Sequence, residues 1–473
     1  MNELPPKGGH IHLTAVCGVG MGSLAGLLQA RGYLVTGSDQ NIYPPMSTYL
    51  AEIGIAVLAG YHAENLSPRP DLVIVGNAIS RTNPEAQAVL NQNIPYISFP
   101  QALGQFLIGS RTSVAVAGTH GKTTTTALAA WVLTCAGLDP GFFIGGVPLN
   151  FGSGWKVGTG NYVVIEGDEY DTAFFDKGPK FLHYRPRHVI FTGLEFDHAD
   201  IYRDLEHVKA AFGQLMDIIP ADGSLVLCAD YAAALEISTR ARCPRVTYGA
   251  NSTADWTADH VEFHEGRTFF EACYRGKSEG RIEVGLIGRH NVMNALAVYA
   301  MGRTLSIEGN RLLEGFSTFR GVKRRQEIRG ERRGVLVIDD FAHHPTAVRE
   351  TIDAVKAAYR GHRLWAIFEP RSNTSKRNIF EKEFADALAH ADRIVVADVH
   401  QPEKVPEGDR LSVENVANLI NGLDKGPRAY VIGNAADIAA RVAQEANPGD
   451  VVLVMSNGGF DAVQEKILQG LAG

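Results

Sequence analysis

The sequence lacks three features that would each have placed it in a special class. Its five cysteines include no C-x-x-C pair, so we expect reduced thiols, no disulfide framework and no zinc site. No apolar run approaches the ~18 residues of a membrane span, and the first ten residues have no apolar core. A net charge of −7 argues against general nucleic-acid binding. We therefore expect a cytoplasmic protein with no nucleic-acid or membrane partner, and a monomer.

The length of 473 residues is too great for one hydrophobic core and suggests three domains of ~150 residues each. The regular pattern loosens between Gln101 and Arg111, and a basic linker, FRGVKRR, occupies Phe319–Arg325. These two positions predict domains at residues 1–107, 108–320 and 321–473.

The segment Ser113–Thr126, SVAVAGTHGKTTTT, has the layout of a phosphate-binding loop. A short β-branched strand ends at Gly118 and is followed by Thr119, His120 and Gly121. The glycines allow backbone N–H groups to approach phosphate, and the following helix presents its positive end. Lys122 can reach the outer phosphates, the Thr123 hydroxyl can hold Mg²⁺, and Thr124 continues the loop. The match is imperfect, because Val116 stands where the general pattern has glycine, so a plain strand–helix turn remains the alternative.

A second glycine-rich turn follows the first strand of the chain. Its residues are Gly18, Val19, Gly20, Met21 and Gly22. The next strand ends at Ser38 and Asp39, which is the spacing of a dinucleotide-binding β-α-β unit. The sixth position of the glycine pattern is Ser23, so the ligand could be a nucleotide-sugar as well as NAD, and a simple packing turn is the alternative.

Carboxylates and a histidine follow two strands of the central region. Tyr162–Ile165 delivers Glu166 at its carboxyl end, and His188–Thr192 precedes Glu195, Asp197, His198 and Asp200. Ligands of open α/β sheets bind at this edge, and carboxylate oxygens suit Mg²⁺. The alternatives are a solvated charge cluster and a hydrogen-bonded structural histidine.

The last third alternates strands with helical patterns, which predicts a parallel, Rossmann-like sheet and an α/β fold. Polar clusters follow four of these strands, at Asp339–Pro345, Glu369–Ser375, Asp398–His400 and Ser456–Phe460. Upstream, Asn291 and Asn294 share one helix face and could meet an adenine edge, with helix capping as the alternative. Four clusters at corresponding strand ends indicate a ligand-binding edge.

Taken together, the motifs resemble those of the Mur ligases, the ATP-dependent amide-forming enzymes of peptidoglycan synthesis. The segments that carry the resemblance are GTHGKTTTT, Glu166, EFDHAD, GRHNVMNALA, GVKRRQE and DDFAHHPTAV. Their order and spacing extend over nearly the whole chain. The resemblance implies an N-terminal Rossmann-like domain for a UDP-sugar, a central P-loop ATPase domain and a C-terminal Rossmann-like domain for the incoming amine.

Within the family, four segments are similar to the members that use a peptide ending in meso-diaminopimelate: SDQNIYPPMST, EGDEYDTAFFDKGPKFLHYRP, LEFDHADIY and FEPRSNTSK. The resemblance then implies UDP-N-acetylmuramate, ATP and the murein tripeptide as substrates, with Mg²⁺ as cofactor, in peptidoglycan recycling. The lactyl carboxylate would attack the γ-phosphate of ATP, and the amine would displace phosphate from the acyl phosphate.

The resemblance also implies roles for individual residues. Phosphate and metal contacts fall to Lys122, Thr123, Glu166 and His198, adenine contacts to His290, Asn291 and Asn294, and ribose or phosphate contacts to Arg325 and Asp339. His343 or His344 could assist deprotonation of the amine. For the peptide we expect Arg371 to bind a carboxylate, Asn373 and Ser375 to adapt to it, and Glu369 to bind the amine. One departure stands out, since Gly193 occupies a position where the family usually has Asn.

Three alternatives remain open from the sequence. The chain could be the biosynthetic ligase that adds L-alanine to the same sugar nucleotide. It could be a P-loop switch or motor NTPase, which would hydrolyse ATP without a UDP-sugar. A nicotinamide oxidoreductase is suggested only by Gly18–Gly22 and Asp39.

Overall fold

The computed structural model describes residues 4–44, 46–199, 201–250, 253–264, 266–423 and 428–472. The chain forms two compact units, which we describe separately. Unit 1 comprises Met1–Leu194, Glu206–Thr257 and Ala297–Gly315, and unit 2 comprises Glu195–Leu205, Ala258–Leu296 and Phe316–Gly473. Within the described ranges, every helix is too short or too polar to cross a lipid bilayer.

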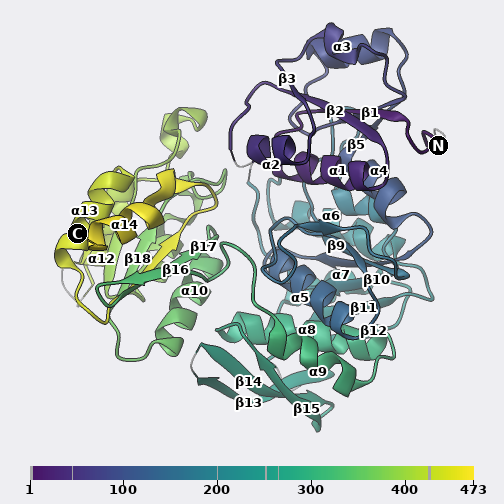
Figure 1. The fold of residues 1–473 in the computed structure, drawn as a ribbon. Coiled ribbons are helices and arrows are strands. Elements are labelled where there is room, and N and C mark those ends of the chain that lie inside the picture. Colours follow the sequence, from purple (N-terminus) through teal and green to yellow (C-terminus); the bar gives the residue numbers. More distant parts are fainter. Residues whose placement is uncertain are drawn as a thin grey trace. The chain divides into compact units, whose positions relative to one another are not determined.

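The first sheet of unit 1 is five-stranded and parallel, in the order β3-β2-β1-β4-β5. Its elements are β1 (His10–Thr14), α1 (Val19–Ala30), β2 (Leu34–Asp39), α2 (Met46–Glu52), β3 (Val57–Ala59), β4 (Leu72–Val75), α3 (Pro84–Asn91), β5 (Tyr96–Ser98) and α4 (Phe99–Ala102). The strand order reverses at β1, which pairs with both β2 and β4 (Figure 1). Ligands bind at such a switch point, at the carboxyl ends of the strands.

The second sheet places the predicted phosphate loop between two other strand ends. Within unit 1 its strand order is β12-β11-β10-β6-β9-β7-β8. The elements are β6 (Thr112–Ala117), α5 (Lys122–Cys135), β7 (Gly141–Phe143), β8 (Trp155–Lys156), β9 (Tyr162–Gly167), β10 (His188–Phe191), α6 (Leu205–Ile218), β11 (Ser224–Cys228), α7 (Ala232–Ser238) and β12 (Arg245–Tyr248). Because β6 pairs in parallel with β9 and β10, the residues after all three strands meet at one edge.

Two parts of the middle region differ from the expectation. Residues 101–111, where the pattern loosens, are mostly helical, and Leu103, Phe106 and Leu107 of this segment are buried. Their three- and four-residue spacing is helical, but the segment is too short to stand out in the sequence. The sequence also did not reveal β13 (Trp256–His264), β14 (Arg267–Tyr274) and β15 (Lys277–Val284), of which β14 and β15 form an antiparallel pair. The helices α8 (Arg289–Thr304) and α9 (Gly309–Thr318) follow.

The third sheet, in unit 2, confirms the predicted parallel arrangement. Its order is β16-β17-β21-β18-β19-β20, and only β16 is antiparallel to its neighbour. The elements are β16 (Glu327–Arg332), β17 (Val335–Asp340), α10 (Pro345–Ala358), β18 (Leu364–Phe368), α11 (Glu381–Leu388), β19 (Arg393–Val396), α12 (Val413–Asn421), β20 (Ala429–Val431), α13 (Ala435–Glu445), β21 (Val451–Met455) and α14 (Val463–Ala472).

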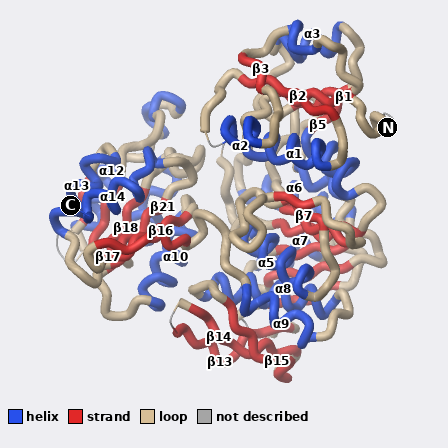
Figure 2. The backbone as a smooth tube through the Cα atoms, in the orientation of Figure 1, coloured by secondary structure: helices blue, strands red, loops and turns tan. Residues whose placement is uncertain are grey.

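Helices cover both faces of this third sheet, as Figure 2 shows. On one face α10, α11 and α12 bury residues such as Val355, Phe384 and Ile420. On the other face α13 and α14 bury residues such as Ile438 and Ile467. Because the faces are covered, the loops at the carboxyl edge of the sheet are left to bind ligands.

Candidate active site

The phosphate loop of unit 1 has the predicted strand–loop–helix geometry. Val116 is fully buried inside β6, and the turn begins at Gly118, whose φ of +128° strongly favours glycine. A Cβ atom on Gly118 would lie 2.4 Å from the Thr192 Oγ1. Gly121, with φ of +78°, caps α5 without a side-chain hydrogen bond. Since Gly118 makes the sharp turn, the loop does not need the glycine that Val116 replaces.

The end of β10 holds this loop in place. The Gly193 carbonyl accepts a hydrogen bond from the Thr119 N–H over 3.0 Å. The Thr192 hydroxyl donates to the carbonyl of His120 over 2.5 Å. The loop is therefore fixed before any ligand binds, as a preformed phosphate site requires.

Lys122 points back onto its own loop. Its ammonium donates to the carbonyls of Gly118 (2.6 Å) and Thr119 (3.2 Å) and pairs with the Glu169 Oε1 at 2.9 Å. Burial alone would lower the pKa of Lys122, but Glu169, followed by Asp168 and Glu166, raises it above its ordinary value. The side chain therefore brings a full positive charge to the loop.

Glu166 lies next to Thr123, as expected of a metal site. The Thr123 hydroxyl donates to the Glu166 Oε1 over 2.9 Å, and the Gly145 N–H donates to the Oε2 over 2.8 Å. These oxygens are hard ligands of the kind that Mg²⁺ prefers, so the residues fit this ion. His198 belongs to unit 2, and its share in a common metal site stays a prediction.

The Tyr231 ring leaves no room for a side chain at Gly193. Its φ is +148°, and a Cβ atom there would lie 2.5 Å from the Cε2 of the Tyr231 ring. Tyr231 follows β11 and directly precedes α7. The ring of Tyr231 therefore occupies the space that an Asn side chain at this position would need.

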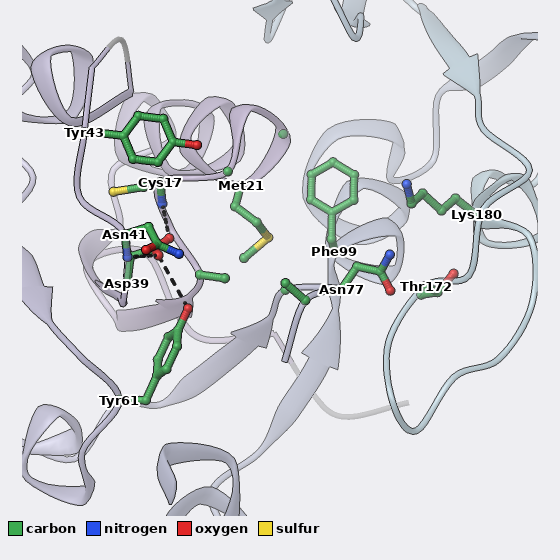
Figure 3. Close-up of a pocket in the computed structure, with 15 residues that line it drawn as sticks. Cys17, Met21, Asp39, Asn41, Tyr43, Tyr61, Asn77, Phe99, Thr172 and Lys180 are labelled. Atoms are coloured by element: carbon green, nitrogen blue, oxygen red, sulfur yellow. Dashed lines mark hydrogen bonds between the residues drawn. The ribbon is translucent and has the colours of Figure 1, made fainter. Parts of the chain in front are cut away.

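A cavity of about 410 Å³ opens at the switch point of the first sheet (Figure 3). Of the predicted UDP-sugar residues, Gly18, Gly20, Met21 and Asp39 line it. Gly18 is the N-cap of α1 and makes no side-chain cap, so the first N–H groups of the helix are available to an anion. Val19 is exposed, whereas Gly22 is buried and a Cβ atom there would meet Met46.

Asp39 organises one wall of this cavity. Its carboxylate accepts hydrogen bonds from the backbone N–H groups of Cys17 and Asn41, both over 2.9 Å (Figure 3). Burial, followed by the charge of Asp39, raises the pKa of Tyr61 to about 12 and also raises that of the Cys17 thiol. Ser38 is fully buried and donates to the Glu85 Oε1 over 2.6 Å, so its hydroxyl faces the interior.

Sequence reasoning missed eleven of the fifteen residues that line this cavity. The missed residues include Tyr61, Asn77, Phe99, Thr172 and Lys180. Asn77 follows β4 and could have been found from the strand-end rule. Thr172 and Lys180 follow β9 of the second sheet and carry no local signal for a site on the first.

In unit 2, the three residues expected to contact adenine form one polar network. The Asn294 amide donates to the Asn291 Oδ1 over 3.1 Å, and the Asn291 amide donates to the Gln326 Oε1, also over 3.1 Å. Gln326 also reaches the His290 Nε2 at 3.4 Å. Burial lowers the pKa of His290 to about 4, so the ring is neutral at pH 7. Gln326, which the sequence did not single out, joins this group.

Two arginines of the basic linker lie at the end of β17. Arg324 lies with its Nε 3.4 Å from the Asp339 Oδ2, whereas Arg325 lies over the Phe341 ring at 4.4 Å. Asp339 is 2% exposed and also accepts a hydrogen bond from Gln464 over 2.8 Å. The contacts of Arg325 and Asp339 with ATP therefore stay predictions.

Asp197 joins three loops of unit 2. It accepts hydrogen bonds from the His198 backbone N–H (2.7 Å) and the Thr374 hydroxyl (2.8 Å), and its Oδ2 lies 3.9 Å from the His343 Nε2. Burial would raise the pKa of Asp197, but His198, His343 and His344 hold it well below its ordinary range. Asp197 is therefore an anion that lies near three histidines. Asp200, expected at the same strand end, lies outside the described residues.

The two adjacent histidines differ in how their ring nitrogens are used. His344 is the N-cap of α10, where its Nδ1 accepts from the Thr346 N–H and its Nε2 donates to the Phe196 carbonyl over 3.2 Å. His343 donates from Nδ1 to the Phe341 carbonyl over 3.0 Å, which leaves Nε2 as the basic nitrogen. Burial lowers the pKa of His343 although Asp197 opposes the shift, so the ring is neutral at pH 7.

The predicted peptide residues lie together on the loop after β18. Arg371 reaches the Glu369 Oε1 at 3.4 Å, and Ser456 donates to the Glu369 Oε2 over 2.5 Å. Ser375 is fully buried, and its hydroxyl accepts hydrogen bonds from the backbone N–H of Arg371 over 3.0 Å. Ser375 therefore shapes the loop, while Asn373 is exposed on it.

Three family models match the chain in succession. They are the Mur ligase family catalytic domain over residues 10–111, the Mur ligase middle domain over 116–302 and the Mur ligase glutamate ligase domain over 324–458. Their succession agrees with a three-domain α/β fold. The domain boundaries themselves, at residues 107 and 320, stay predictions.

Individual relatives match over almost the full chain. The UDP-N-acetylmuramate--L-alanyl-gamma-D-glutamyl-meso-2,6-diaminoheptandioate ligase of Escherichia coli is 41% identical over 98% of each chain. The UDP-N-acetylmuramate--L-alanine ligase of Salinibacter ruber is 35% identical over 97% of this chain and 94% of its own. The crystal structure of a murein peptide ligase from Psychrobacter arcticus is 37% identical, has a TM-score of 0.71, and covers 98% of this chain and 99% of its own.

Proposed function

Because this chain belongs to the Mur ligase family of ATP-dependent, amide-forming ligases, we propose that it joins UDP-N-acetylmuramate to L-alanyl-γ-D-glutamyl-meso-diaminopimelate in peptidoglycan recycling. The observation that carries the choice of acceptor is the sequence identity of 41% with a ligase named for that tripeptide, against 35% with a ligase named for L-alanine. The Arg371–Glu369 pair agrees with it, since Glu369 offers an anion to the side-chain ammonium that the tripeptide carries in addition to its reacting amine, and Arg371 offers a cation to a carboxylate.

The reaction has two steps. The lactyl carboxylate of UDP-N-acetylmuramate attacks the γ-phosphorus of ATP, which gives an acyl phosphate and releases ADP. The acceptor amine then attacks the acyl carbon, and inorganic phosphate leaves as the amide bond forms. A carboxylate is a poor electrophile, so activation by phosphate is necessary, and the protein contributes position and positive charge.

Lys122 supplies positive charge at the phosphate loop. Its ammonium would leave the carbonyls of Gly118 and Thr119 and bind the outer phosphates of ATP. The first N–H groups of α5, which no side chain caps, would bind phosphate oxygens from the other side.

Thr123, Glu166 and His198 are our proposed ligands for Mg²⁺. When bound, Mg²⁺ would neutralise charge on the phosphates that Lys122 also contacts. Glu166→Gln should raise the Mg²⁺ concentration needed for activity, because it removes an anionic oxygen beside the Thr123 hydroxyl. An unchanged Mg²⁺ dependence in a folded variant would contradict this assignment.

The cavity of the first sheet would hold the sugar nucleotide. Its diphosphate would lie on the uncapped N-terminus of α1, near Gly18 and Gly20. Asp39 would shape the wall through its bonds to Cys17 and Asn41. Lys180, which lines the cavity and pairs with Asp168, adds a cation for this anionic ligand.

His343 is our proposed base for the acceptor amine, because its Nε2 is basic and the ring is neutral at pH 7. His344 instead caps α10 with one nitrogen and donates to Phe196 with the other. For the acceptor itself, Arg371 would bind a carboxylate, Glu369 the side-chain ammonium, and the exposed Asn373 an adaptable polar group.

The cytoplasm is the compartment in which ATP is available to this reaction. The five cysteines, all of which lie in described ranges, are free thiols, as a reducing compartment favours. We propose a monomer, because one chain carries the residues assigned to all three substrates.

Product analysis by mass spectrometry tests the proposed function. The enzyme is incubated with ATP, Mg²⁺, UDP-N-acetylmuramate and the tripeptide, and each component is omitted in turn. Formation of UDP-N-acetylmuramyl-tripeptide only in the complete mixture is the expected result. ADP release without the UDP-sugar would instead identify a P-loop switch or motor NTPase.

A further inference from the structure

Lys376 is a buried lysine on the loop that follows β18. It is 4% exposed, and its backbone N–H donates to the Ser372 carbonyl over 3.1 Å. Among the residues that the structure describes, none provides its ammonium with a hydrogen bond or an ion pair. The aliphatic stem of Lys376 is therefore buried while its ammonium reaches the surface, where it can bind an anionic ligand.

The surroundings of Lys376 are cationic. The exposed Lys404, together with Arg371 and Arg377, adds to the effect of burial and lowers the pKa of Lys376, while the exposed Glu403 alone opposes it. The charges near Lys376 are therefore mostly positive.

His400 connects this lysine to the Arg371–Glu369 pair. Its backbone N–H donates to the Pro370 carbonyl over 3.0 Å, and its Nδ1 lies 4.0 Å from the Glu369 Oε1. Burial and the charges of Arg371, Lys376 and Lys404 lower the pKa of His400. The Glu369 carboxylate therefore lies beside the neutral His400 ring, and the loop after β18 that carries Glu369 also carries Lys376.

From this juxtaposition we infer that Lys376, with His400, binds the carboxylate that shares a carbon with the side-chain ammonium of the acceptor's terminal residue. The inference rests on the proposed function, in which Glu369 binds that ammonium and Arg371 binds the other carboxylate. The contact between Lys376 and this carboxylate would then distinguish diaminopimelate from lysine. The lysine side chain carries the same ammonium and lacks only this carboxylate.

The test compares two acceptors with wild type and Lys376→Met, at saturating ATP and UDP-N-acetylmuramate. Methionine keeps the buried aliphatic stem and removes the charge. For L-alanyl-γ-D-glutamyl-meso-diaminopimelate, kcat/KM should fall about 10- to 100-fold through KM, as loss of one charged contact implies. For L-alanyl-γ-D-glutamyl-L-lysine it should stay at the wild-type value.

Three controls make each outcome decisive. Lys382→Met removes an exposed charge from α11, a helix that packs on the same sheet. It should leave kcat/KM unchanged for both acceptors. Lys376→Arg should keep part of the preference for diaminopimelate. Equal losses for both acceptors, or no loss for either, would overturn the inference. Wild-type preference for L-alanine over both tripeptides would instead refute the proposed function, whatever Lys376→Met does.

Discussion

The Arg371 side chain lies against the backbone of Gly458, so closely that a Cβ atom on Gly458 would fall 1.8 Å from the Arg371 Nε. Gly458 follows β21, which pairs with β18, and so the loops after these two strands share one edge. Arg324 fixes the same loop by donating to the Ser456 carbonyl (2.6 Å) and the Gly458 carbonyl (2.5 Å). Arg371, the proposed carboxylate-binding residue, can therefore take this position only because residue 458 is a glycine without a Cβ atom.

Gly458→Ala should displace Arg371 and weaken use of the peptide acceptor. We expect KM for the tripeptide to rise about tenfold or more, since one charged hydrogen bond is lost, with little change in KM for ATP. Gly459→Ala is the matched control, because a Cβ atom on Gly459 meets nothing within 4 Å. Steady-state kinetics of the two variants measure this effect. Equal KM values for the tripeptide would show that Arg371 does not bind the acceptor.

Gly193→Asn should damage both the fold and the phosphate loop. The φ of +148° disfavours a side chain by on the order of 1–3 kcal/mol, and the new Cβ atom would meet the Tyr231 ring. Because the Gly193 carbonyl holds the Thr119 N–H, KM for ATP should rise along with the loss of stability. Gly193→Asn/Tyr231→Ala should recover part of both losses. No recovery in the double variant would show that the ring is not the obstacle.

Lys122→Ala should reduce kcat by about 100-fold or more, because positive charge is lost where phosphate charge develops. The variant also removes the partner of Glu169, so thermal unfolding must confirm that it is folded. Lys177→Ala is the control, since that lysine is exposed and pairs with Asp171 at the surface. A wild-type kcat in folded Lys122→Ala would refute the assignment.

His290 should make stability depend on pH. Its pKa is about 4 in the folded protein, against an ordinary value of 6.5, so the unfolded chain binds a proton first as the pH falls. The stabilisation from the neutral ring is complete above pH 6.5 and is lost as the pH falls toward 4. The unfolding temperature of wild type should therefore drop more between pH 7 and pH 4.5 than that of His290→Gln. Parallel pH profiles would show that the ring is protonated in the folded state.

Local patterns predicted several strands and the residues that follow them well. Leu364–Phe368 and Val451–Met455 are strands with the predicted bounds, because short apolar runs between turn residues are strong signals. The neighbouring positions of Thr123 and Glu166 followed from the rule that parallel strands end at one edge.

What the sequence could not show depends on contacts between distant segments. Thr172 and Lys180 line a cavity of the first sheet although they follow a strand of the second. Tyr231 explains Gly193 only because β11 and β10 are neighbours, which no local pattern reveals. The burial of Lys376 likewise depends on the fold, since a lysine on a loop is usually exposed.

The central claim is the acceptor, and initial rates of phosphate release measure it most directly. With saturating UDP-N-acetylmuramate and ATP, the wild-type enzyme is given either L-alanyl-γ-D-glutamyl-meso-diaminopimelate or L-alanine. We predict a kcat/KM for the tripeptide that is higher by on the order of 100-fold or more, since L-alanine lacks the side-chain ammonium that Glu369 would bind and has one carboxylate where the tripeptide has three. Equal or better use of L-alanine would contradict the account and identify the biosynthetic ligase.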